Sequence, residues 1–347
     1  MRPLYVSPIG RGGVDFGIQN ITRSLRRAGH PAELLRLPEL YNFAPALIAR
    51  AMPPGWWRGF DVVQGRSRVA FALKAAVDGE RPVVTTVHHL TSDPELQPYS
   101  SRAQRLFYRL VEQRYDGWSI RRADAVICVS RFTQRQVQQT YGLSDTTLVF
   151  DGIDTDVFVP TPGLHRRDDG LPPTDARVRL LFIGNNTRRK GFDLLPKIMD
   201  LLPNDYTLFY NGGFQKTGGP PHPGMVNIGS PDRAGLVAAY QSCDVLLFPS
   251  RLEGFGIAPA EALACGRPVV TTDATALPEV VDHGLNGFLV RRNDVEGYAE
   301  RTRELGEDAG LRQRFGEHGR EKVVRVFGYD QLAAGMLDVY TRVLGRR

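Results

Sequence analysis

Short apolar, β-branched runs alternate with segments of helical periodicity along the whole chain. Nearly continuous apolar runs such as AVICV and DVLLF are typical of strands covered on both faces, as in parallel sheets. Between them, segments 18–27 and 194–202 repeat apolar residues at helical spacing. This alternation predicts an α/β protein with two doubly wound domains. The expected strands are 4–7, 33–37, 61–64, 83–87, 125–129, 147–150, 178–183, 206–210, 225–228, 245–248, 269–271 and 288–290.

The domain boundaries follow from a break in this alternation. Residues 155–175 are rich in proline, glycine and charge and show no clear period, so they predict a linker. We therefore expect an N-terminal domain at 1–160 and a C-terminal domain at 176–328. The last segment, 329–347, contains an amphipathic helix expected at 331–344.

Composition restricts the class of protein. The 347 residues suffice for two domains with separate cores. No apolar run reaches the roughly 18 residues of a membrane-spanning helix. The N-terminal MRPLYVSPIG predicts a strand and a turn and lacks the pattern of a signal peptide. Cys128, Cys243 and Cys265 are too few and too scattered for a disulfide or zinc framework. These features predict a cytoplasmic protein.

Charge is distributed unevenly along the chain. Residues 1–150 contain 20 Lys and Arg against 12 Asp and Glu, whereas the remainder contains 24 against 26. In the basic half, a helix expected at 101–118 carries Arg102, Arg105 and Arg109 near one face and apolar residues on another. The nearby MPPGWWRGF adds tryptophans. Such a surface suits peripheral docking on the inner, anionic face of a membrane. An ordinary solvated face over a core that contains Trp56 and Phe107 is the alternative.

A glycine-rich turn follows the first strand. The sequence GRGGVDFG places Gly12 and Gly13 where backbone N–H groups can approach an anion at the start of a helix. It is not a dinucleotide fingerprint, because Asp15 occupies the position of the third glycine, and it lacks the Lys-Ser/Thr of a P-loop. A purely structural turn is the alternative, since glycine is common wherever φ is positive.

Two glutamates flank a second glycine turn, in PSRLEGFGIAPAEALACGRPVV. Glu253 lies on a loop at the carboxyl edge of the strand 245–248, where open α/β sheets bind ligands. A helix is expected to begin near Pro259, which places Glu261 in its first turn. The N–H groups of 256–258 can face a phosphate, while Glu261 can accept hydrogen bonds from hydroxyls such as those of a ribose. Alternatively, Glu261 only complements the helix dipole.

These residues resemble a known family. The E-x7-E stretch above is similar to the signature of family 4 retaining glycosyltransferases, and VVTTVHH, ADAVICVS, FDGIDTDVF and IGNNTRRKG support the resemblance in the right order along nearly the whole chain. The resemblance implies a GT-B fold: two Rossmann-like domains face each other across a cleft, and the last helix returns to pack on the first domain. It also implies an N-terminal acceptor domain, a C-terminal nucleotide-sugar domain, and no metal or other cofactor.

The resemblance also implies roles for individual residues. Glu261 would bind the donor ribose, and Glu253 would meet the sugar and diphosphate. Arg189 and Lys190 would stabilise the charge that develops on the leaving diphosphate; their adjacent arrangement is similar to that of the lipopolysaccharide-core glucosyltransferases. A solvated basic turn is the alternative, because Arg188 makes three cations in a row. Backbone contacts to the donor would come from Gly12, Gly13, Gly254, Phe255, Gly256 and Ile257.

Two further residue sets have competing interpretations. His88, after the strand 83–87, matches a histidine that lies near the transferred sugar in the family, although the alternation of a strand leaves His89 as a rival. Asp154 and Asp156 spell the DxD of metal-dependent glycosyltransferases of another fold. They lie in the entry to the linker, however, and two carboxylates cannot fill a divalent site.

The sequence therefore predicts a retaining, metal-independent glycosyltransferase that moves a hexose from a UDP- or GDP-sugar to a hydroxyl acceptor. The acceptor is a glycan, a glycolipid or a small metabolite, and a lipid-linked or anionic one suits the basic N-terminal half. No nucleic-acid partner is expected. A same-fold epimerase or hydrolase and a non-catalytic nucleotide-sugar-binding subunit are the rival functions.

Overall fold

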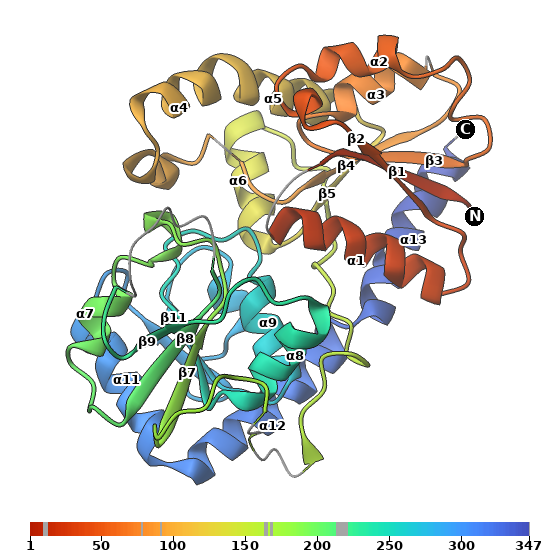
Figure 1. Ribbon diagram of the computed structural model, residues 1–347. Helices are drawn as coiled ribbons and strands as arrows, with labels where there is room; N and C mark the ends of the chain where they lie inside the picture. Colours follow the sequence, from red (N-terminus) through yellow and green to blue (C-terminus); the bar gives the residue numbers. More distant parts are fainter. Residues whose placement is uncertain are drawn as a thin grey trace. The chain divides into compact units, whose positions relative to one another are not determined.

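The computed structural model describes residues 1–9, 13–77, 79–90, 92–162, 166, 169–212 and 221–346 (Figure 1). These form two compact units. Unit 1 comprises Met1–Gly152 and Tyr329–Arg347, and unit 2 comprises Ile153–Gly328. Residues 153–160, which we expected in the first domain, therefore lie in the second. The chain leaves unit 1 after Gly152 and re-enters it after Gly328.

Unit 1 is built on a six-stranded parallel sheet with strand order β2-β1-β3-β4-β5-β6. Its strands are β1 Pro3–Pro8, β2 Glu33–Leu37, β3 Val62–Arg66, β4 Val83–Val87, β5 Ala125–Cys128 and β6 Thr147–Leu148. Its helices are α1 Gly13–Arg27, α2 Ile48–Ala51, α3 Ala70–Val77, α4 Arg102–Phe107, α5 Gln113–Arg122, α6 Arg131–Tyr141 and α13 Tyr329–Gly345.

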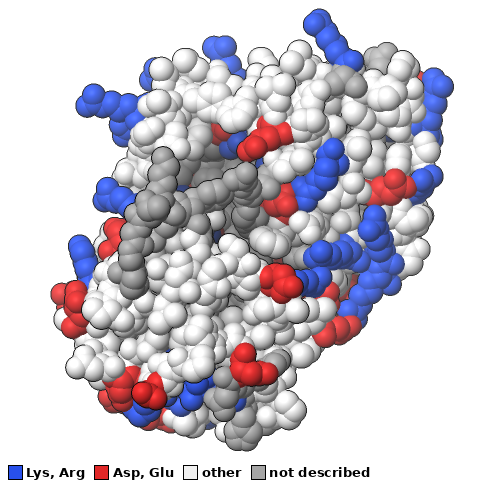
Figure 2. Space-filling view, in the orientation of Figure 1, with Lys and Arg blue, Asp and Glu red and all other residues white. Residues whose placement is uncertain are grey.

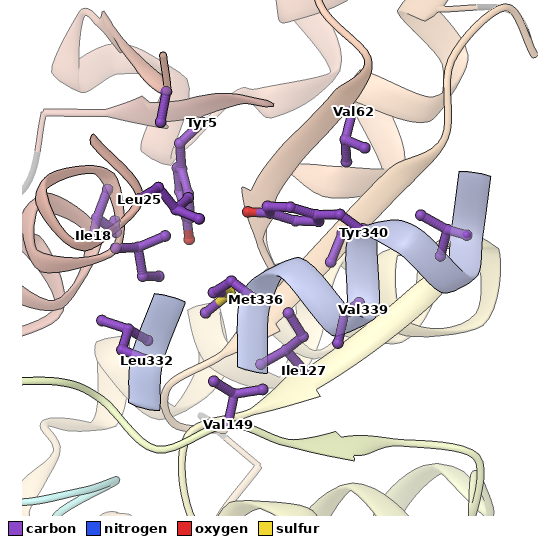
Figure 3. Packing of buried hydrophobic residues seen from close by; sticks show 14 residues of the cluster. Tyr5, Ile18, Leu25, Val62, Ile127, Val149, Leu332, Met336, Val339 and Tyr340 are labelled. Atoms are coloured by element: carbon purple, nitrogen blue, oxygen red, sulfur yellow. The ribbon is translucent and has the colours of Figure 1, made fainter. Parts of the chain in front are cut away.

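The C-terminal helix α13 is part of the core of unit 1 (Figure 3). Its apolar residues recur at helical spacing, so that one face is buried. That face packs against β1 and α1, where Tyr5 and Ile18 are at most 2% exposed. The hydroxyl of Tyr340 donates a hydrogen bond to Gln64 of β3. The return of the last helix to the first domain is thereby confirmed. The residues that α13 contributes are Leu332, Met336, Val339, Tyr340 and Val343.

Two expectations for the basic half need correction. The helix expected at 101–118 is interrupted by a π-helical turn, Tyr108–Glu112, between α4 and α5. At that turn Glu112 points inward and pairs with Arg68 at 2.7 Å. The tryptophans expected on the surface are partly buried, because Trp56 and Trp57 pack against the apolar cluster of β1, β3 and α3. Trp57 Nε1 also donates to Glu80 at 2.9 Å.

Unit 2 contains the second parallel sheet, with strand order β12-β11-β10-β7-β8-β9. Its strands are β7 Val178–Phe182, β8 Tyr206–Tyr210, β9 Met225–Asn227, β10 Val245–Phe248, β11 Val269–Thr272 and β12 Gly287–Val290. Its helices are α7 Leu195–Met199, α8 Arg233–Ser242, α9 Ile257–Ala264, α10 Leu277–Val280, α11 Val295–Glu307 and α12 Ala309–Val326.

All twelve strands expected from the sequence are present, within one or two residues at each end. The helix expected at 194–202 is shorter, and α7 begins at Leu195 with Pro196 in its first turn. Within the described ranges, no helix is long and apolar enough to cross a bilayer. The three cysteines are buried and free.

Candidate active site

The sheet of unit 2 has a topological switch point between β7 and β10. These two strands are neighbours, although β8 and β9 lie between them in the sequence. The strand that follows β7 in the sequence, β8, lies on one side of this pair in the sheet, and the strand that follows β10, β11, lies on the other. Ligands of open α/β sheets bind in the crevice outside the carboxyl ends of the strands at such a point. The loops after β7 and β10, residues 183–191 and 249–256, carry the expected basic pair and Glu253.

The basic pair lies on a 3-10 turn, Arg188–Lys190, whose shape is fixed by its neighbours. The turn ends at Gly191, whose φ of 75° is left-handed. A Cβ at Gly191 would lie 2.0 Å from the carbonyl oxygen of Pro249, so only glycine permits this approach of the two loops. The turn is therefore held directly against the loop that follows β10.

Lys190 and Glu253 form an ion pair between the two loops. Lys190 Nζ donates to Glu253 Oε1 at 2.5 Å, and the two side chains are 15% and 10% exposed. Ser250 Oγ donates to the same carboxylate oxygen at 2.6 Å. Burial lowers the pKa of Lys190, and Glu253 partly offsets that shift. Burial acts to raise the pKa of Glu253, but Lys190 and Arg189 outweigh it and the pKa is lowered. The contact thus favours the charged form of each partner.

Arg189 is held by backbone contacts to the same loop. Its Nη1 donates to the carbonyl oxygen of Leu252 at 2.9 Å, and the Arg251 amide donates to the Arg189 carbonyl at 2.9 Å. The interpretation of these residues as a merely solvated turn does not fit, since only Arg188 of the three has a largely exposed side chain, at 74%. Two cations are consequently fixed at the switch point.

Arg251 positions this arrangement and was not singled out by the sequence. Its side chain is 5% exposed, and Nη1 and Nη2 donate to Asp193 at 2.6 and 3.0 Å. Nε donates to Asn293 at 2.6 Å, and Nη1 also donates to the carbonyl of Arg188. A bidentate guanidinium–carboxylate pair fixes geometry as well as charge. Arg251 thus connects the basic turn to the segment before α11.

The second glycine turn leads into α9, whose first backbone N–H groups have no side-chain cap. Gly256 is the N-cap with a φ of 118°, and no side chain caps the helix. The N–H groups of Ile257 and Ala258 therefore remain available for an anion at the helix start. Phe255 is 3% exposed and packs edge-on against Phe327 at 5.2 Å, so it can meet a ligand only through its backbone. Gly254 precedes it on the same loop.

Glu261 lies further along α9 than the sequence predicted. Because α9 begins at Ile257, Glu261 is its fifth residue, and no acidic residue occupies the first turn. The expectation of a first-turn position was wrong, and so was the helix-dipole alternative that depended on it. The Tyr240 hydroxyl donates to Glu261 Oε2 at 2.9 Å. Burial raises the pKa of Glu261 to about 7, although Tyr240 and Arg233 act to lower it.

The remaining expected residues belong to unit 1. Gly12 lies outside the described residues, and Gly13 is the first residue of α1. His88 follows β4 and is 7% exposed. Its Nε2 lies 3.8 Å from Asp151 Oδ1. Burial, assisted by the charge of Arg66, lowers the pKa of His88 to about 3, so the imidazole is neutral.

Asp154, the first residue of the DxD sequence, is engaged in a structural contact. Asp154 accepts from Arg233 Nη2 at 2.6 Å. The carbonyl of Thr155, between the two aspartates, accepts from Arg320 at 2.8 Å. No group of three His, Cys, Asp or Glu side chains with metal-ligand geometry occurs among the residues that the structure describes. Asp154 therefore helps to hold the segment after Gly152 on unit 2.

Two family models match the chain. Residues 11–157 match Glycosyltransferase Family 4, and residues 226–322 match Glycosyl transferases group 1. A D-inositol 3-phosphate glycosyltransferase of Xylanimonas cellulosilytica is 31% identical over 253 residues, which are 65% of this chain and 58% of that protein. The chain thus matches little more than half the length of that relative. A lipopolysaccharide core biosynthesis mannosyltransferase, LpcC of Rhizobium leguminosarum bv. viciae, is 28% identical over 84% of this chain and 82% of its own.

Solved structures share the fold. A sucrose-phosphate synthase from Thermosynechococcus elongatus matches all of both chains with a TM-score of 0.82 at 19% identity. HepE of Anabaena, in complex with UDP and glucose, matches 98% of this chain and 99% of its own with a TM-score of 0.77 at 18% identity. These likenesses and the two parallel sheets confirm a two-domain α/β protein of the GT-B fold. The chain belongs to the family 4 glycosyltransferases.

Proposed function

We propose that this protein is a retaining glycosyltransferase that takes a hexose from a nucleotide sugar and transfers it to a hydroxyl acceptor. The observation that carries the proposal is the pair of fixed cations, Arg189 and Lys190, at the switch point of unit 2 beside the buried carboxylate of Glu253. HepE, which shares the fold, is solved with UDP-glucose, so a UDP-sugar is the first donor to test. A GDP-sugar is the second.

The charges of the site suit departure of a nucleoside diphosphate. As the bond to the sugar breaks, negative charge accumulates on the diphosphate, and preorganised cations stabilise it more strongly than they stabilise the ground state. Lys190 and Arg189 are placed for this role, and the N–H groups at the start of α9 add to it. We infer front-face displacement, in which the leaving phosphate takes the proton of the acceptor hydroxyl, and no divalent metal.

Glu261 is proposed to bind the ribose of the donor. Replacing Glu261 with alanine should weaken UDP binding by about 1–3 kcal/mol, since hydrogen bonds to a charged group are lost. Titration calorimetry measures this, with Glu296→Ala, exposed on α11, as a matched control. Tyr240→Phe should have a smaller effect of the same sign, because it removes one donor to the carboxylate. Unchanged UDP affinity in Glu261→Ala would place the ribose elsewhere.

This assignment also predicts a pH dependence. Burial raises the pKa of Glu261 to about 7, so the carboxyl is protonated below that pH in the free protein. Ribose hydroxyls donate to the ionised carboxylate and favour it, so UDP affinity should rise as the pH increases through 7. In Glu261→Gln the rise should be absent.

On the acceptor side, we propose that the surface around α4 docks on an anionic lipid bilayer that carries the acceptor. Arg102, Arg105 and Arg109 are exposed there. Basic side chains protrude in Figure 2 at the upper left, where Figure 1 draws α4. Leu106 and Leu110 are 51% and 49% exposed, and Leu106 lines a cavity of about 540 Å³. Exposed leucines among arginines provide both the apolar and the electrostatic part of interfacial binding.

Sedimentation with vesicles tests this surface. The protein should bind vesicles rich in anionic lipid at low salt, and binding should weaken above about 0.5 M salt, where screening is short-ranged. The double variant Arg105→Gln/Arg109→Gln should bind less. Arg314→Gln/Arg325→Gln, on exposed positions of α12, should bind as the wild type does. No binding to anionic vesicles at low salt would contradict the proposal and favour a soluble acceptor.

A further inference from the structure

His88 and Asp151 form a buried pair in unit 1 with polar atoms that lack hydrogen-bond partners. Among the residues that the structure describes, neither ring nitrogen of His88 has a hydrogen-bond partner, and neither has Asp151 Oδ1. The two side chains are 7% and 4% exposed, and His88 Nε2 lies 3.8 Å from Asp151 Oδ1. Buried polar atoms without partners are uncommon, and each such atom requires a physical explanation. At 3.8 Å, this nitrogen and this oxygen need only a small shift to reach hydrogen-bonding distance.

The fold holds Asp151 in this place from two sides. The residue that follows it, Gly152, accepts a hydrogen bond from Asn20 Nδ2 of α1 at 2.8 Å. Asn20 Oδ1 in turn accepts from the hydroxyl of Tyr329, the first residue of α13, at 2.7 Å. A Cβ at Gly152 would lie 2.7 Å from Leu332, so the turn is packed closely against α13. Such contacts fix the backbone that carries the carboxyl group.

Helix α1 covers the pair with a glycine. A Cβ at Gly17 would lie 3.1 Å from Asp151 Oδ1 and 3.2 Å from His88 Nε2. The same position therefore touches both partners, and any side chain there would press on both. Gly17 lies within α1, and its φ is not in the left-handed region. Its requirement for glycine thus comes from the space beside the pair.

We propose that Asp151 is a positioning residue for His88: its carboxyl group binds Nε2 of the imidazole, fixes the ring, and sets which of the two ring nitrogens carries the proton. The consequence for transfer rests on the function proposed above and on the family resemblance, which implies that His88 lies near the transferred sugar. Control of the tautomer does not depend on that function. It is a property of unit 1 alone, since both residues and their supports belong to that unit.

The chemistry of the pair depends on one proton. The charged or titratable groups that influence it are Arg66 of β3, which acts on His88, and Tyr5 of β1, which interacts with Asp151. Burial raises the pKa of Asp151 to about 7 and lowers that of His88 to about 3. Below pH 7 the carboxyl O–H donates to Nε2, and the ring proton is on Nδ1. Above pH 7 one proton leaves the pair, and the remaining proton moves to Nε2, which then donates to the carboxylate.

Nitrogen-15 NMR of the histidine rings tests the pairing without any substrate. In the full-length wild-type protein, the His88 ring, assigned with a His88→Gln variant, should change from the Nδ1–H to the Nε2–H tautomer as the pH rises through about 7. In Asp151→Asn the amide N–H donates to Nε2 at every pH, so the Nδ1–H form should persist. A wild-type tautomer that does not change with pH, or an unchanged transition in Asp151→Asn, would overturn the inference.

Kinetics then separate the pairing from the proposed function. Asp151→Ala and Gly17→Ala should each lower kcat by on the order of tenfold to a hundredfold, as expected when a reacting group is misplaced. Asp151→Asn should retain more activity and lose the part of the pH–rate profile near 7. If the tautomer follows the predicted course but Asp151→Ala leaves kcat and KM unchanged, the pairing stands and the contact of His88 with the sugar is contradicted.

Discussion

Replacement of Lys190 by alanine is expected to lower kcat by about a hundredfold or more, in the range found for other preorganised stabilisers of transition-state charge. The Nζ of Lys190 is held 2.5 Å from Glu253 Oε1 by the protein itself, and a cation fixed in this way is preorganised for the charge of the departing diphosphate. Arg189→Ala should cost a similar factor. KM for the donor should change less than kcat, because the charge is largest on the leaving group.

The neighbouring arginine provides a matched control. Arg188 belongs to the same turn, but its side chain is 74% exposed. Arg188→Ala should therefore keep activity close to that of the wild type. Steady-state kinetics with a UDP-sugar donor measure all three variants. Turnover at the wild-type rate in both Lys190→Ala and Arg189→Ala would remove these residues from the leaving-group site and revive the interpretation of a merely basic turn.

Replacement of Glu253 by alanine is expected to affect both stability and activity. It leaves the buried Lys190 cation without its partner, and breaking a buried ion pair typically costs about 3–5 kcal/mol of unfolding free energy. Activity should fall strongly as well, since Glu253 is proposed to face the sugar. Chemical denaturation measures the first effect. UDP should restore part of the lost stability, because a diphosphate beside Lys190 binds only the folded state.

A double variant separates the effect on stability from the effect on activity. In Lys190→Met/Glu253→Leu no buried charge remains unpaired, so stability should recover relative to Glu253→Ala, whereas activity should not. Glu300→Ala, whose side chain on α11 is 67% exposed, serves as the control for loss of a carboxylate in the same unit. If Glu253→Ala unfolds at the same denaturant concentration as the wild type, the ion pair does not stabilise this loop.

The fold was largely predictable because its signals are local. Strands covered on both faces require continuous apolar runs, and such runs are visible without knowledge of their neighbours. The loops of the donor site were also visible, since Arg189, Lys190 and Glu253 lie directly after strands at a predictable edge. The start of α9 was misplaced toward Pro259, because the left-handed φ of Gly256 moves the cap and proline is tolerated inside the first turn.

The supporting residues could not be predicted in the same way. Arg251 reaches Asn293, 42 positions away, and Tyr240 reaches Glu261, 21 positions away. His88 and Asp151 follow different strands, β4 and β6, and nothing in the spacing of the sequence indicates that they meet. Contacts of this kind depend on strand order and helix packing, which a single sequence does not specify. The same reason explains why Trp56 and Trp57 were expected on the surface although they pack on a core cluster.

The most direct test of the proposed activity is proton NMR of a transfer reaction in buffer that contains EDTA. The protein is incubated with UDP-glucose or GDP-mannose and with inositol phosphate, hexose 1-phosphate or lipid-linked oligosaccharide as acceptors, and Lys190→Ala serves as the control. We expect the nucleoside diphosphate and a glycoside with the anomeric configuration of the donor to form together, only with an acceptor present. Release of free sugar without an acceptor, a product of inverted configuration, or activity restored only by manganese would contradict a retaining, metal-independent glycosyltransferase.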